Sequence, residues 1–98
     1  MFGQIEEMQK QLQEKLEQIT IQHKVADAKI SIDVNANRKV LDIAIDPSLL
    51  NAEDPDELQD LLIIGLNEAL QKAEAKAAEE TQNMMSGILP PGFNFPGM

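Results

Sequence analysis

The chain has 98 residues, of which 17 are acidic and 8 are basic, so its formal net charge is -9. It contains no Cys, Trp or Tyr, which excludes disulfides and thiolate metal sites and is typical of a reducing cytoplasm. It shows no cleavable signal and no apolar run long enough to span a bilayer, so we expect one small cytoplasmic domain without a membrane partner.

An amphipathic helix is predicted from residue 4 to about residue 18. Its apolar residues recur at intervals of three and four, namely Ile5, Met8, Leu12, Leu16 and Ile19. Two interpretations of this narrow stripe remain open. The helix either packs on the core of its own chain, or it forms a projecting arm whose polar face contacts a partner.

Three segments then alternate between apolar and polar residues, as strands do. They lie at 19–25, 30–34 and 40–45. The connections at 26–28 and 35–37 are short enough for hairpins, and Asn tolerates the left-handed conformation that such turns need. The pattern therefore predicts a three-stranded antiparallel sheet with one apolar face, which a single layer of helix can cover.

A second helix is predicted from about residue 55. Asp54 can cap its first amides, Pro55 suits the first helical position, and Glu57 completes a capping-box-like signal. We expect this helix to end near Met85, because residues 86–98 are rich in Pro and Gly. The predicted domain is thus 1–85, followed by a flexible tail at 86–98 whose Ile, Leu and Phe side chains also suit docking onto a neighbouring surface.

The second helix is apolar almost all round between residues 61 and 66. Such a turn needs cover on more than one side. The chain's own sheet can supply one side and a second copy of the protein the other. The predicted dimer interface comprises Leu61, Leu62, Ile64, Gly65 and Leu66, with Gly65 permitting close approach. In the third strand, Val40 and Ala44 fall on the polar face and are consistent with extra burial at a subunit boundary.

The sequence gives no support for catalysis. His23 is the single histidine, and no nucleophile and base are paired by spacing. The acids between Glu53 and Asp60 lack the loop spacing of a calcium-binding hand, and they complement the positive end of the helix dipole. No glycine-rich phosphate cradle occurs. We therefore predict a non-enzyme with no metal, no cofactor and no small-molecule substrate.

Only the middle of the chain is basic. Residues 22–41 have a net charge of +2, against -2 for residues 1–21 and -9 for residues 42–98. The four cations flank the two predicted hairpin turns: Lys24, Lys29, Arg38 and Lys39. They suit contacts with duplex phosphates, or they simply keep the sheet edges soluble. The lack of aromatic residues in the sheet argues against binding of single-stranded nucleic acid.

Several segments in fixed order resemble the YbaB/EbfC family of small bacterial nucleoid-associated proteins: Met1-Phe2-Gly3, Ile45-Asp46-Pro47-Ser48-Leu49-Leu50, Leu58-Gln59-Asp60-Leu61-Leu62, Asn67-Glu68-Ala69-Leu70 and Leu89-Pro90-Pro91-Gly92-Phe93. The resemblance implies an α+β fold in two layers, with a helix, a three-stranded antiparallel sheet and a second helix. It also implies a homodimer with projecting N-terminal helices that binds DNA with little sequence preference. Where the family usually has glycines at the hairpins, this chain has Ala and Asp, which implies altered turns.

Two functions follow as hypotheses. The first is a homodimeric, nucleoid-associated protein that binds duplex DNA through phosphate contacts from Lys10, Lys15, Lys24, Lys29, Arg38 and Lys39. The alternative is an acidic protein-interaction module that recruits a protein partner in DNA repair or replication and binds DNA weakly or not at all.

Overall fold

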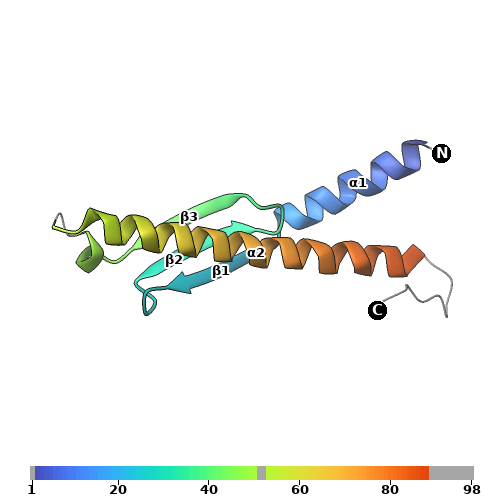
Figure 1. Cartoon of the computed structure of the whole chain (residues 1–98). Coiled ribbons are helices and arrows are strands. Elements are labelled where there is room, and N and C mark those ends of the chain that lie inside the picture. Colours follow the sequence, from blue (N-terminus) through green and yellow to red (C-terminus); the bar gives the residue numbers. More distant parts are fainter. Residues whose placement is uncertain (1, 51–52, 89–98) are drawn as a thin grey trace.

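The computed structural model describes residues 2–50 and 53–88. In chain order, it contains helix α1 (Phe2–Glu17), strands β1 (Thr20–Val25), β2 (Ile30–Asn35) and β3 (Val40–Ile45), a 3-10 turn η1 (Pro47–Leu49) and helix α2 (Pro55–Ile88). Helix α2 runs along the whole molecule, with the sheet beside its first half and α1 beside its second half (Figure 1). The predicted α+β architecture is confirmed. No helix in the described residues is long and apolar enough to cross a membrane.

The core lies between α2 and the central strand. The sheet is antiparallel with the order β1-β2-β3. Ile30, Ile32 and Val34 of β2 are fully buried and contact Ala69 and Ala73 of α2. Small alanine side chains let the helix approach the branched side chains of the strand closely. The alternation of β2 therefore sets which face of the sheet receives α2.

Helix α2 covers β1 and β2 but leaves β3 largely uncovered. Ile43 pairs with the buried Ile32 and so faces the helix side of the sheet. It is nevertheless exposed, as are Val40 and Leu41. One helix is too narrow to cover three strands, so an apolar edge strand remains open.

The start of α2 is confirmed, because Asp54 Oδ1 accepts a hydrogen bond of 3.3 Å from the Glu57 amide. Its end differs from the expectation near Met85, since the helix continues to Ile88. A single glycine inside a helix costs only about 1 kcal/mol, so Gly87 does not stop it. The tail is predicted to be either flexible or docked on a neighbouring surface. From residue 89 onward it lies outside the described part of the chain.

The apolar stripe of α1 packs on the core at its C-terminal end and is exposed at its N-terminal end. Leu16 near its C-terminus is buried, Met8 and Leu12 are half-buried, and Ile5 is 56% exposed. The amide of Ala36, in the turn between β2 and β3, donates to Leu16 O at 3.1 Å and to Ile19 O at 3.0 Å. The Leu16 carbonyl lies in the last turn of α1, where carbonyls have no partner within the helix, and the Ile19 carbonyl lies in the link to β1. The base of α1 is thus fixed to the sheet, and the helix becomes more exposed toward its N-terminus.

Both hairpin turns differ in detail from the prediction. In the first turn, Ala26, Asp27 and Ala28 all have positive φ, of 56°, 56° and 67°. In the second turn, Arg38 takes the left-handed conformation, with φ 63°. The expectation that an Asn would supply this backbone conformation is therefore wrong. Asn35 stabilises the turn in another way, through hydrogen bonds from its side chain.

Strand β3 contains an irregularity that strict alternation does not predict. Asp33 pairs with Asp42, but Val34 pairs with Val40, so Leu41 has no partner across the ladder. One extra residue of this kind is a β-bulge, which bends a strand and shifts its alternation. Val40 therefore lies opposite the buried Val34, and its assignment to the polar face is corrected.

Candidate nucleic-acid interface

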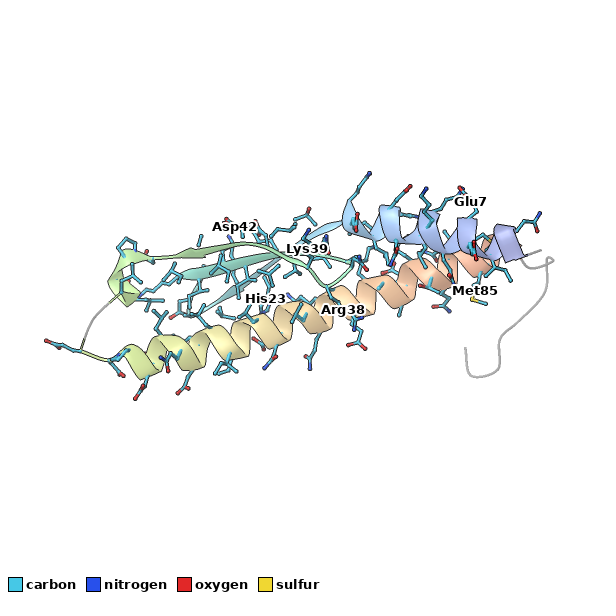
Figure 2. All side chains as sticks on the ribbon, turned by 90° about the horizontal axis from the view of Figure 1, so that it is seen from above. Glu7, His23, Arg38, Lys39, Asp42 and Met85 are labelled. Carbon is cyan, nitrogen blue, oxygen red and sulfur yellow. The ribbon has the colours of Figure 1, made fainter. Side chains whose placement is uncertain are left out.

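Of the six predicted DNA-contacting cations, four lie at the two ends of the sheet and two lie on α1. Lys24 and Lys29 adjoin the β1–β2 turn, whereas Arg38 and Lys39 form part of the β2–β3 turn at the base of α1 (Figure 2). The two turns lie at opposite ends of β2, a strand of six residues that spans about 20 Å. Lys10 and Lys15 extend along α1. The structure therefore brings four cations to the α1 end and leaves two at the other.

Asn35 holds the turn that carries Arg38 and Lys39. This side chain is only 2% exposed. Its Oδ1 accepts hydrogen bonds from the amides of Asn37 and Lys39, both at 3.0 Å, and its Nδ2 donates to Glu17 O at 3.5 Å. The Arg38 amide donates to Asn35 O at 3.0 Å. A buried amide with satisfied hydrogen bonds is a rigid anchor, so the backbone that carries Arg38 and Lys39 is fixed relative to α1.

Lys15 differs from the other five cations because it is already paired. Its Nζ lies 2.8 Å from Glu80 Oε2 on α2. Lys76 approaches the other oxygen, Glu80 Oε1, at 3.5 Å. The hydrogen bond from Lys15 is the main cause that lowers the pKa of the Glu80 carboxyl. Within the described residues, no ion pair involves Lys10, Lys24, Lys29, Arg38 or Lys39.

At the other end of the sheet, an acid lies close to the cations. The Asp46 amide donates to Lys29 O at 2.7 Å. The pKa of the Asp46 carboxyl is lowered, chiefly by the hydrogen bond that it accepts from the Ser48 amide at 2.8 Å and to a small extent by the charge of Lys29. A carboxylate that stays charged beside Lys29 offsets part of its attraction for phosphate.

Two carboxylates stand between the basic ends, on the face of the sheet that α2 does not cover. Asp33 and Asp42 are direct cross-strand partners. Asp33 Oδ1 is buried without a hydrogen-bond partner among the described residues. Like charges directly opposite one another are unfavourable, and they also repel phosphate. The two acids therefore disfavour a phosphate backbone across the middle of the open face. The alternation of the sequence placed both acids on this face but did not reveal their pairing.

His23 has a structural partner. It lies on the half-buried face of β1, and its Nε2 is 3.2 Å from Glu68 Oε1 on α2. This contact joins β1 to α2 near the middle of the helix. In the described part of the chain, no group of three or more His, Cys, Asp or Glu side chains is arranged to hold a metal ion.

The residues of the predicted dimer interface lie on different sides of α2. Gly65 faces the chain's own sheet, where an added Cβ would come within 2.8 Å of Ile32 Cδ1. Leu61, Leu62 and Leu66 are half-buried against the core. Ile64 is 53% exposed and lies one turn before Glu68, on the β1 side of the helix. Helical spacing puts Leu62 and Leu66 on the opposite flank, toward β3.

Comparisons with known proteins agree with this architecture. The model of the YbaB/EbfC DNA-binding family matches residues 1–88, so the match ends before the Leu89–Phe93 segment. Among solved structures, the chain is similar to the uncharacterized protein HP0035 from Helicobacter pylori, with 26% sequence identity and a TM-score of 0.66. That match covers 90% of this chain and 98% of the other. Because the family model spans nearly all of the sequence and the fold agrees, this chain belongs to the YbaB/EbfC family of nucleoid-associated DNA-binding proteins.

Proposed function

We propose that this chain binds duplex DNA as a homodimer, with little sequence specificity and no catalytic role. The contacts are to phosphates, from Lys10, Lys15, Lys24, Lys29, Arg38 and Lys39. Phosphate contacts carry no sequence information by themselves. Any preference among sequences would come from the shape of the DNA. Membership of the DNA-binding family supports the class of ligand.

The position of Arg38 and Lys39 is the observation that carries this proposal. Buried Asn35 fixes their turn, and the Ala36 amide joins that turn to the end of α1. The exposed Lys10 lies further along the same helix. The backbone that carries Arg38 and Lys39 is already ordered before binding, which favours a phosphate site at this end of the sheet.

Self-association is supported by the uncovered strand. Val40, Leu41 and Ile43 present exposed apolar surface on an edge strand, next to the flank of α2 that carries Leu62 and Leu66. Exposed apolar edges are typical of interfaces. We propose that the dimer interface comprises β3 and the adjacent flank of α2, which carries Leu62 and Leu66. A two-fold dimer doubles the number of basic groups available to one duplex.

The experiment is fluorescence anisotropy of a labelled duplex at increasing salt. We expect micromolar binding at low salt that weakens steeply, with a slope of log K against log salt of about -0.9 for each phosphate contacted. Changing Arg38 and Lys39 together to Gln should reduce the slope by about 1.8 per protomer. The matched control changes Lys72 and Lys76 of α2, which are not among the proposed contacts, to Gln. An equal loss in both pairs would show that the total charge of the protein, rather than these contacts, sets the binding.

A second function is favoured by the acidity of the surface. Helix α2 carries seven acids against Lys72 and Lys76, and Asp33 and Asp42 occupy the open face of the sheet. These features suit a protein-interaction module linked to DNA repair or replication. Anisotropy that stays flat even at low salt would reject the DNA-binding proposal and favour this alternative.

A further inference from the structure

An apolar groove separates the outer parts of the two helices. It has a volume of about 170 Å³ and is lined by Ile5, Met8, Gln9 and Leu12 of α1 and by Thr81, Met84 and Met85 of α2. The Thr81 hydroxyl donates to Ala77 O at 2.8 Å, so it is already satisfied. Ile5 and Met85 are both substantially exposed. Figure 2 shows Met85 at the end of the molecule where α1 begins. An open groove of this kind leaves flexible methionines in contact with water.

The groove matches an aromatic ring in size and polarity. An apolar cavity of about 150 Å³ is large enough to take up benzene, which is close to the volume found here. The chain has only three aromatic residues of the Phe, Tyr and Trp kind, all of them Phe, and two are Phe93 and Phe95. Both belong to the segment 89–98, which follows α2 directly and lies outside the described residues.

We propose that segment 89–98 of the same chain turns back at the end of α2 and inserts Phe93 or Phe95 into this groove. The segment contains no charged side chain, in a protein whose surface is strongly acidic. Pro90 and Pro91 are unfavourable in a helix interior, which is consistent with the proposed reversal after α2. Its composition therefore suits an apolar groove rather than open solvent.

The distances allow this arrangement. Met84 lies four residues before the last helical residue, Ile88, which is about 6 Å along the helix axis. Phe93 lies five residues after Ile88, and five extended residues span up to about 17 Å. The segment can thus reverse and reach the groove without strain. In this position it would brace α1 against α2, in addition to the ion pair from Lys15 to Glu80 described above.

The test is NMR of the full chain labelled with ¹³C at the methionine methyl groups. The chain has five Met, and Met8, Met84 and Met85 line the groove. A ring in the groove shifts their signals upfield. We expect the Phe93→Leu and Phe95→Leu double variant to return these signals toward free methionine, and the single variants to identify the inserted ring. The matched control is Phe2→Leu, which should leave the shifts in place.

Two results would overturn the proposal. In the first, the double variant leaves the three signals unchanged, or Phe2→Leu alone removes the shift. In the second, labelled wild-type chains refolded with a large excess of the unlabelled double variant lose the shift, which would assign the ring to the other copy. Retention of the shift in that mixture supports insertion within one chain. None of these readouts depends on DNA binding.

Discussion

Lys15 Nζ on α1 lies 2.8 Å from Glu80 Oε2 on α2, and this ion pair joins the base of the first helix to the middle of the C-terminal half of the second. Glu80 is only 8% exposed, whereas more than half of the Lys15 side chain is accessible. The Glu80 side chain is thus held in place by packing, whereas the Lys15 side chain extends along the surface to reach it. The same lysine is one of the cations proposed to contact DNA, so the two roles compete.

Glu80→Gln should strengthen DNA binding. The change removes a negative charge and leaves Lys15 available for a phosphate. We expect the affinity at low salt to rise by roughly two- to tenfold and the slope of log K against log salt to steepen by about 0.9 per protomer. Anisotropy measures both quantities. Glu79→Gln is the matched control, because Glu79 is more exposed and lies near Lys76 rather than Lys15. Equal gains in both variants would show that only the total charge matters.

The same acid should make stability depend on pH. The pKa of the Glu80 carboxyl is lowered from its usual 4.5, first by the hydrogen bond from Lys15. The unfolded chain therefore takes up the proton before the folded chain does. This contribution to stability is fully present above about pH 4.5 and is lost as the pH falls through the folded pKa. Thermal melts should show a smaller loss on acidification for Glu80→Gln than for the wild type; identical slopes would contradict this account.

Leu41→Asp should weaken the proposed dimer. Leu41 is 48% exposed on the uncovered strand β3, where a charge would be buried on self-association. Light scattering should give about twice the chain mass of 10.9 kDa for the wild type and a value near one chain for the variant. Ile64→Asp, on the β1 flank of α2, tests whether that side of the helix also takes part in association. Leu50→Asp, at a leucine exposed elsewhere, is the control. A dimer that survives Leu41→Asp would place the interface away from β3.

Gly65→Ala should destabilise the fold despite the higher helix propensity of Ala. The new methyl group would lie 2.8 Å from Ile32 Cδ1 and 3.1 Å from Val25 Cγ2. Overpacking costs about 1–3 kcal/mol and propensity returns about 1, so we expect a net loss of about 1 kcal/mol in the free energy of unfolding. Ile32→Val removes Cδ1 and should be less harmful in the Gly65→Ala background than in the wild type. A strictly additive double-mutant cycle in urea would exclude this contact as the cause.

Ala28→Gly should stabilise the first hairpin. Ala28 has φ 67°, a conformation that costs a residue with a Cβ about 1–2 kcal/mol and glycine almost nothing. Part of this gain is lost to the greater entropy of glycine in the unfolded chain, which leaves about 0.5–1 kcal/mol. Ala44→Gly in β3, where φ is not positive, should instead be destabilising. Denaturant unfolding of the two variants should therefore move in opposite directions.

Local sequence patterns determined the elements of this protein. The period of the apolar residues predicts both helices and all three strands, because each period reflects the geometry of its own backbone. Asp54, Pro55 and Glu57 likewise predict the start of α2, since a helix cap is made by neighbours in sequence. The sequence also shows where the cations lie along the chain, but it does not show which of them share one end of the sheet.

Only the tertiary structure decided which distant residues meet. The β3 bulge follows from pairing with β2. Asn35 fixes the β2–β3 turn because the Asn35 side chain is buried against the end of α1. Gly65 packs against Ile32 of the same chain, where the sequence suggested close approach by a partner. Lys15 meets Glu80 across 65 positions of sequence, and no local pattern records such a contact. These features depend on how the helix lies across the sheet, which is set by packing of the whole core.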